Sequence, residues 1–198
     1  ERTELNKNVL ILEGARQVGN TYLLESFLKN KKGLISLNLE KDRLLRSEID
    51  SLSSFGEFEL LLKTRFAFKE KEPQIIFIDE AQESRGLGSF VRFMKEDWQN
   101  KSVILSGSSM SHLFNDSRVP VGRVEYLRLT PFSFFEFLRA KDKEVFLDLY
   151  HQNNFETSKW VHEQMLSFYD EFLKVGGLPE VVFSYLENPD SDRYKQIR

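Results

Sequence analysis

The sequence contains no cysteine. This absence excludes disulfide bridges, thiolate metal sites and cysteine nucleophiles. A chain without cysteine is also compatible with a reducing compartment, so we expect a cytoplasmic location.

An excess of charge of one sign is lacking as well. The 28 Lys and Arg residues nearly balance the 31 Asp and Glu residues, which gives a formal net charge of −3. A protein that coats nucleic acid or an anionic membrane needs a large positive excess. We therefore expect neither nucleic acid nor membrane as a partner.

Long apolar runs are missing too. None approaches the roughly 20 residues of a transmembrane helix. The charged start Glu1-Arg2-Thr3-Glu4 is followed by no apolar region typical of a secretory signal. The histidines, His112, His151 and His162, stand apart without metal-ligand spacing, so no histidine metal site is expected.

The composition that is present is that of a globular protein. The 198 residues, 40% hydrophobic and 30% charged, allow one domain with a small appendage. A chain of this size buries roughly 70% of its unfolded surface. The 18 phenylalanines mostly follow helix or strand spacing, which favours a role in the core over base stacking.

The stretch from Val9 to Leu24 organises the rest of the chain. Val9–Leu12 is an apolar run that predicts a buried strand, and a helical pattern starts near Thr21. Between them, Gly14 and Gly19 have the spacing of a phosphate-binding loop, G-x-x-x-x-G-K-[ST], although Asn20 occupies the lysine position. Taken alone, this loop is equally compatible with a glycine-bearing turn that binds nothing.

Asp79 and Glu80 end the continuous apolar run that starts at Gln74. Such runs are typical of strands buried on both faces of a parallel sheet. Two carboxylates at this point suit a phosphoryl-transfer site, where Asp79 would hold Mg²⁺ and Glu80 would polarise water. The alternative is a pair of solvated acids, which we consider less favoured because a phosphate-loop pattern lies upstream.

Two further positions are candidates for phosphate contacts. Ser106 follows the next apolar strand, where a polar side chain could sense the γ-phosphate, although an ordinary Ser-Gly turn would look the same. Arg123 follows Gly122 and could reach phosphate in its own site or in a neighbour's. A surface arginine is an equally good interpretation.

Strand and helix patterns alternate along the first two thirds of the chain, which predicts an α/β fold with a parallel sheet flanked by helices. From about residue 141 only helical patterns follow. We therefore expect domains at 1–140 and 141–198, the second being a small helical lid or the start of a further region. Strands are predicted at 9–12, 34–39, 74–78, 103–105 and 124–129, and helices at 21–30, 42–50, 54–66, 86–98, 131–140, 145–150, 160–175 and 180–186.

In combination, six motifs in order resemble the prokaryotic AAA-like P-loop ATPases, over roughly residues 9–187. The matching segments are Gly14-Ala15-Arg16-Gln17-Val18-Gly19-Asn20-Thr21, Phe77-Ile78-Asp79-Glu80-Ala81-Gln82, Leu105-Ser106-Gly107-Ser108-Ser109, Gly122-Arg123, Leu129-Thr130-Pro131-Phe132-Ser133-Phe134-Phe135-Glu136-Phe137 and Gly176-Gly177-Leu178-Pro179.

The resemblance implies a P-loop NTPase core with an additional strand between the two Walker strands, followed by a helical lid. It implies ATP and Mg²⁺ as ligands, with Thr21 and Asp79 on the metal and Glu80, Ser106 and Arg123 in the catalytic machinery. Members often carry a further C-terminal domain, so the chain is expected to be a fragment. The implied nucleotide-binding residues are Gly14, Ala15, Arg16, Gln17, Val18, Gly19, Asn20, Thr21 and Tyr22.

Asn20 is the departure with the largest consequence. A charge-assisted hydrogen bond to phosphate contributes roughly 1.5–3 kcal/mol, so an asparagine weakens binding, and weakens hydrolysis more because charge develops on the phosphate oxygens. Whether hydrolysis survives stays open. The expected function is an ATP-binding domain with weakened ATPase activity, acting with a protein partner or as a homo-oligomer.

Two other functions remain as alternatives. One is an inactive P-loop module that holds or regulates a partner, which Asn20 favours and the retention of Thr21, Asp79 and Glu80 disfavours. The other, a dinucleotide-binding oxidoreductase, is weaker. Glu40 follows the second strand as that class requires, but the loop lacks G-x-G-x-x-G.

Overall fold

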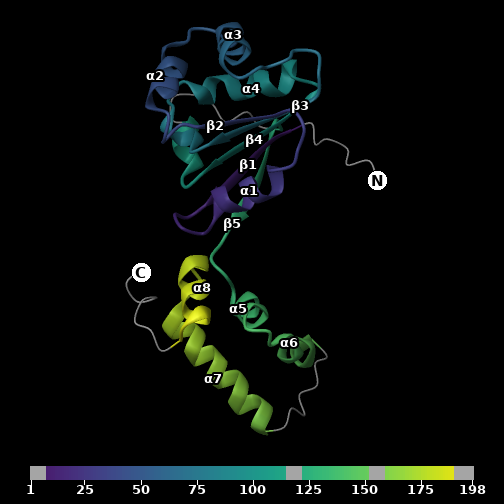
Figure 1. Cartoon of the computed structure of the whole chain (residues 1–198), viewed down its shortest axis with the longest axis vertical. Helices are drawn as coiled ribbons and strands as arrows, with labels where there is room; N and C mark the ends of the chain where they lie inside the picture. The colour runs from purple at the N-terminus through teal and green to yellow at the C-terminus, as the bar shows by residue number, and fades with distance from the viewer. Residues whose placement is uncertain (1–7, 115–121, 152–158, 190–198) are drawn as a thin grey trace. The chain divides into compact units, whose positions relative to one another are not determined.

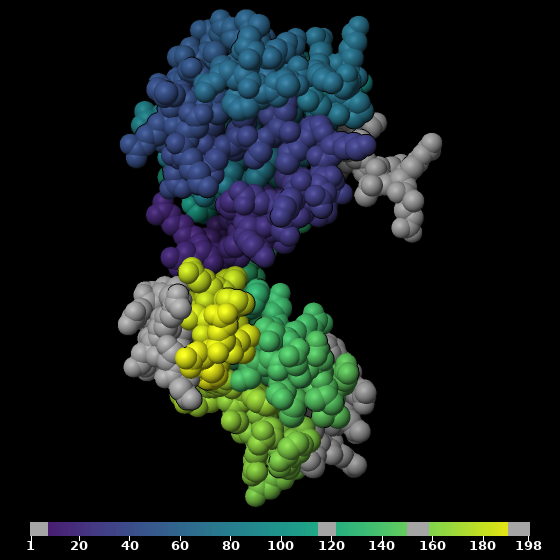
Figure 2. Space-filling model, viewed as in Figure 1, coloured from purple at the N-terminus to yellow at the C-terminus, as the bar shows by residue number. Residues whose placement is uncertain are grey.

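The computed structural model describes residues 8–114, 122–151 and 159–189, and it divides into two compact units (Figures 1 and 2). The first spans Glu1–Leu129 and the second Thr130–Arg198. The sequence predicted a domain boundary at residue 140. In the structure the helix Phe134–Ala140, which precedes that boundary, belongs to the second unit. The reason is packing, because Phe137 is buried against Val175, Val181 and Val182.

The first unit is built on a five-stranded sheet with the order β2-β3-β4-β1-β5. Every pairing in it is parallel, as the α/β prediction requires. β4 lies between β1 and β3, so the additional strand expected between the two motif-bearing strands is present. The strands are β1 (Val9–Gly14), β2 (Leu34–Asn38), β3 (Gln74–Asp79), β4 (Lys101–Gly107) and β5 (Val124–Leu129).

Helices cover both faces of this sheet, as predicted. Side chains alternate between faces along a strand, so Phe77 lies in the core on one face while its neighbours Ile76 and Ile78 lie in the core on the other. Burial on both faces explains the continuous apolar run in β3. The helical elements are α1 (Asn20–Leu28), α2 (Arg43–Ser51), α3 (Phe55–Arg65), η1 (Ala81–Glu83), α4 (Leu87–Asp97) and η2 (Met110–Phe114).

The two cores differ in size. On one face, Leu24 and Leu28 of α1 pack against Leu12, Phe77 and Ile104. On the other, α2, α3 and α4 build a larger core that includes several aromatic rings, which confirms the core role expected for those phenylalanines. The stacked or tilted rings there include Phe55, Phe58, Phe90 and Trp98.

The second unit is entirely helical in its described residues, with α5 (Phe134–Ala140), α6 (Glu144–His151), α7 (Lys159–Val175) and α8 (Pro179–Glu187). α5 begins three residues later than expected, because Ser133 caps it. Glycine is required at position 177, where a Cβ would lie 2.3 Å from the Phe132 carbonyl oxygen. In the described part of the chain, no helix combines the length and apolarity needed to cross a membrane.

Candidate functional site

Asp79 lies at the centre of a hydrogen-bonded cluster at the carboxyl edge of the sheet. Its side chain is buried, with 2% of the residue exposed. Oδ2 accepts hydrogen bonds from Thr21 Oγ1 at 3.0 Å and from Asn38 Nδ2 at 2.9 Å. Oδ1 accepts one from Ser106 Oγ at 2.5 Å. The structure thus brings together three residues that the sequence singled out, and adds Asn38.

The loop after β1 has the backbone of an anion-binding turn. Gln17 and Gly19 both adopt positive φ, at 68° and 92°, and α1 begins at the next residue with Gly19 as its cap. A Cβ on Gly14 would lie 2.9 Å from the Leu129 carbonyl oxygen, so the close approach of β5 requires glycine there. Backbone N–H groups in such a turn, next to a helix N-terminus, attract phosphate.

The side chains of the loop differ in exposure. Val18 is buried. Ala15, Arg16 and Gln17 are exposed, as is Tyr22 in the first turn of α1. The exposed set therefore includes one cation, that of Arg16, beside the turn.

Asn20 ties the loop to the end of β4. Its Nδ2 donates to the carbonyl oxygens of Gly14 at 3.1 Å and Gly107 at 3.4 Å. Its Oδ1 is buried without a hydrogen-bond partner. A lysine has only donors, so it would leave no such acceptor unpaired in this position.

Glu80 follows β3 in the left-handed conformation, with φ 52° and ψ 44°, which is uncommon for a residue with a side chain. Its Oε2 accepts a hydrogen bond from Gln82 Nε2 at 2.5 Å. Burial raises the pKa of the Glu80 carboxyl above its ordinary value. The hydrogen bond from Gln82 lowers this pKa in part, and the negative charge of Asp79 raises it further. The carboxylate is therefore a better proton acceptor than a solvated glutamate.

Arg123 is not brought to this cluster. It immediately precedes β5, and its carbonyl oxygen accepts a hydrogen bond from the N–H of Val9 at the start of β1. Its guanidinium pairs with Glu96 at 2.8 Å. The phosphate loop lies at the opposite end of β1, roughly 16 Å away along the strand. A phosphate role for Arg123 therefore requires a second protein molecule.

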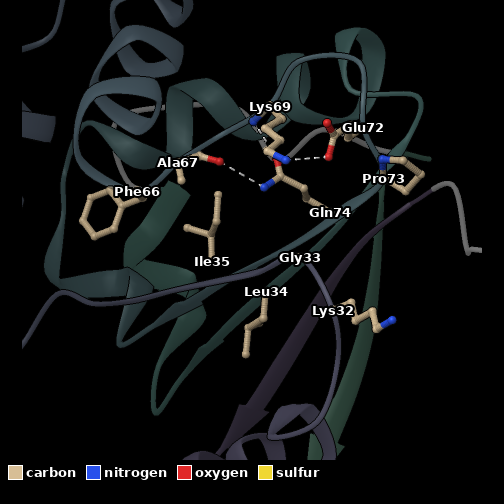
Figure 3. A pocket seen from close by; sticks show the side chains of 10 residues that line it. All are labelled: Lys32, Gly33, Leu34, Ile35, Phe66, Ala67, Lys69, Glu72, Pro73 and Gln74. Atoms are coloured by element: carbon tan, nitrogen blue, oxygen red, sulfur yellow. Dashed lines mark hydrogen bonds and ion pairs between the residues drawn. The ribbon is translucent and has the colours of Figure 1, made fainter.

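A pocket of about 380 Å³ lies at the amino-terminal ends of β2 and β3. Figure 3 shows Gln74 in its middle, where the side chain accepts from Lys69 N at 2.7 Å and donates to the Ala67 carbonyl oxygen at 3.3 Å. Lys69 also pairs with Glu72 at 2.9 Å. These polar groups bind one another, and ligands of parallel sheets bind at the carboxyl ends of strands, so the Asp79 cluster is the better candidate.

Two residues of the cluster were missed by sequence reasoning. Asn38 is the last residue of β2, and the pairing of β2 with β3 cannot be deduced from the sequence of either strand. Gln82 is the last residue of the Phe77–Gln82 motif, but the sequence predicted no role for it. Asn38 and Gln82 both contact a carboxylate that was predicted.

The site offers few ligands for a metal ion. Among the described residues, no group of three His, Cys, Asp or Glu side chains could hold one. Mg²⁺ is usually held by one or two carboxylates together with phosphate oxygens and water. A divalent ion at Asp79 would therefore need a phosphate ligand.

Comparisons with known proteins concern the family and the fold of the chain. A family model described as an AAA domain matches residues 6–138. An uncharacterized protein of Methanocaldococcus jannaschii is 27% identical over 191 residues, which are 95% of this chain and 39% of that protein. An uncharacterized protein of Haemophilus influenzae is 24% identical over 179 residues, which are 89% of this chain and 40% of that protein. The chain thus spans about two fifths of the length of these relatives.

A solved structure, that of the Drosophila ORC bound to DNA, contains a chain with the same fold. The TM-score is 0.52 at 18% identity, over 96% of this chain and 60% of that chain. At this identity the likeness concerns the fold alone.

Proposed function

The chain belongs to the AAA domain family, and from this premise we propose that the carboxyl edge of its sheet is an ATP site. The observation that carries the proposal is the 3.0 Å hydrogen bond from Thr21 Oγ1, at the start of α1, to the buried carboxylate of Asp79. It places a hydroxyl and a carboxylate beside the turn whose backbone suits phosphate. The residues proposed to contact the nucleotide are Gly14, Ala15, Arg16, Gln17, Val18, Gly19, Asn20, Thr21 and Tyr22.

Thr21 and Asp79 are the residues that would hold Mg²⁺. Their oxygen atoms suit a hard cation, and Asn38 and Ser106 fix the Asp79 carboxylate from two other strands. When bound, Mg²⁺ would neutralise charge on the β- and γ-phosphate oxygens.

Glu80 is proposed as the base of the reaction. Its carboxylate would accept a proton from the water that attacks the γ-phosphate, and the pKa raised by burial favours this transfer. Ser106 is buried, and its hydroxyl is committed to Asp79. A hydroxyl has one proton to donate, so we assign Ser106 to orienting that carboxylate, and it would sense the γ-phosphate only by releasing Asp79.

Hydrolysis is proposed to be weak because of Asn20. The asparagine amide has two N–H donors but no charge, and it donates to the carbonyl oxygens of Gly14 and Gly107. Loss of a charged partner of phosphate corresponds to roughly 1.5–3 kcal/mol. This same feature favours the second candidate function, a P-loop module that regulates a partner without turning over ATP.

Calorimetric titration with ATP, with and without Mg²⁺, tests the site. We expect Thr21→Ala to weaken Mg-ATP binding about tenfold, since it removes a metal ligand, and to change binding without Mg²⁺ little. Thr64→Ala is the matched control, because the Thr64 hydroxyl donates only within α3. Absence of binding at millimolar ATP would overturn the proposal and favour the regulatory module, whereas binding without turnover would narrow the function to nucleotide sensing.

A further inference from the structure

Gln82 lies in η1, a three-residue turn that is fastened on its far side to α2. Glu83 pairs with Arg46 of α2 at 2.9 Å. Ser84, fully buried, donates from Oγ to Asp50 Oδ1 at 2.6 Å. The backbone that carries Gln82 is therefore held by contacts that do not depend on the Gln82 side chain.

In the carboxamide of Gln82 the nitrogen makes a hydrogen bond and the oxygen makes none. Nε2 donates to Glu80 Oε2 at 2.5 Å, whereas Oε1 is buried without a hydrogen-bond partner. Turning the amide over would place Oε1 against the Glu80 carboxylate, where two acceptors repel each other. A buried acceptor without a partner is unfavourable, so the hydrogen bond to Glu80 determines the orientation of the amide.

Gly107, at the end of β4, provides the space for this amide. A Cβ on Gly107 would lie 1.8 Å from Gln82 Oε1 and 2.9 Å from its Cδ. The residue before it, Ser106, binds Asp79. The end of β4 therefore supports the carboxylates of both Asp79, the last residue of β3, and Glu80, which follows it, the first directly and the second through Gln82.

From this geometry we propose that Gln82 is a positioning residue, whose amide, lodged against Gly107, holds the Glu80 carboxylate in place for activation of water. This role rests on the proposed ATPase function, because Glu80, the residue that Gln82 holds, is the proposed general base of ATP hydrolysis. A glutamate side chain has several rotatable bonds, and a catalytic group acts well only when its rotamer is fixed by its surroundings. Gln82 acts through Glu80 and is not assigned any contact with nucleotide.

The first experiment compares ATP affinity and single-turnover hydrolysis in the wild-type chain and in Gln82→Ala. We expect hydrolysis to slow by roughly 10- to 100-fold while the affinity for ATP changes by less than about twofold. Gln99→Ala, at an exposed position, is the matched control and should change neither quantity. If wild-type turnover is too slow to follow, the same series is measured in the Asn20→Lys background.

Gly107→Ala gives an independent test, since its methyl group displaces the Gln82 amide without removing it. We expect this variant to slow hydrolysis as Gln82→Ala does. Truncation of Gln82 removes the nearest contact of that methyl group, and the other side chain that it meets is the flexible thioether of Met110, whose Sδ would lie 2.9 Å away. The double variant should therefore be no slower than Gln82→Ala alone. Such non-additivity is the signature of a direct contact.

Equal hydrolysis by wild type and Gln82→Ala overturns the proposal, as do losses that add in the double variant. A parallel fall in melting temperature and ATP affinity would also overturn it, because it indicates a structural role alone. Failure of the wild-type chain to bind ATP is a different result, seen in the titration itself, and it overturns the proposed function.

Discussion

Three donors converge on Asp79, and each comes from a different element. Thr21 reaches it from α1, Asn38 from β2 and Ser106 from β4. A buried carboxylate is unfavourable unless it accepts hydrogen bonds, so this cluster stabilises both the charge and the meeting of the strands. At the scale of single residues, Asn20 is then the feature that separates this site from a fully equipped phosphate loop.

We expect Asn20→Lys to tighten ATP binding by about tenfold or more, because it restores a charged donor to phosphate. Hydrolysis should rise by a larger factor, since the cation also stabilises charge that develops in the transition state. The measurement is ATP titration together with phosphate release. Asn30→Lys, the same change at an exposed position just beyond the end of α1, is the control. Equal affinities in wild type and Asn20→Lys would contradict the expectation.

At the scale of elements, local signals predicted most of the structure. The β3 run was readable because burial on the sheet imposes that pattern. In α1 the helical spacing predicted one apolar face made by Leu23, Leu24, Phe27 and Leu28, of which Leu24 and Leu28 are buried and the other two are exposed. Contacts between elements were less accessible to sequence reasoning. Asn38 reaches Asp79 because β2 lies beside β3, and Arg123 lies at the far edge because β5 runs parallel to β1. Neither pairing can be read from one strand alone.

The cap of α5 provides a prediction at this scale. Ser133 and Glu136 form a capping box, and we expect Ser133→Ala to lower the free energy of unfolding of the helical unit by about 1 kcal/mol. Hydrogen bonds from the backbone and side chain of Ser133 lower the pKa of the Glu136 carboxyl. A lowered folded-state pKa contributes stability above the unfolded value of about 4.5, and this is lost as pH falls through the folded value.

Urea unfolding of wild type and Ser133→Ala, at about pH 7 and about pH 3, measures both effects. The difference between the two proteins should shrink at the lower pH, because the protonated Glu136 accepts hydrogen bonds more weakly. Ser111→Ala, at an exposed position in η2, serves as the control. A difference that does not depend on pH would show that the hydrogen bond from the Ser133 hydroxyl to the Glu136 carboxylate contributes nothing to the cap.

At the scale of the whole molecule, the two units have separate cores. The clusters that line the sheet contain residues up to Leu129, whereas the remaining clusters begin at Phe132. The sequence placed the division at residue 140, after α5, whereas the two units divide after Leu129, before α5, because a helical pattern does not reveal which core the helix packs against. The packing of Phe137 reveals it.

A protein containing residues 1–129 is therefore expected to fold without the helical unit. It should show the circular dichroism of an α/β domain and a single cooperative urea transition, because its cores are complete. A protein ending at residue 122 lacks β5 and serves as the comparison. It should unfold at lower urea, since β1 loses one of its two neighbours. Failure of residues 1–129 to unfold cooperatively would contradict the division into units.

Because β1 lies between β4 and β5, its two neighbours in the sheet are synthesised long after β1 itself. Glu13 of β1 is paired with Arg128 of β5, 115 residues later. At roughly 5–20 residues per second, the ribosome needs roughly 6–23 s to supply that partner. β1, which precedes the other four strands of this sheet in the sequence, is thus among the last to be fully paired, and such long-range pairing slows folding. The phosphate loop, carried by that strand, takes shape only after almost all of the surrounding unit exists.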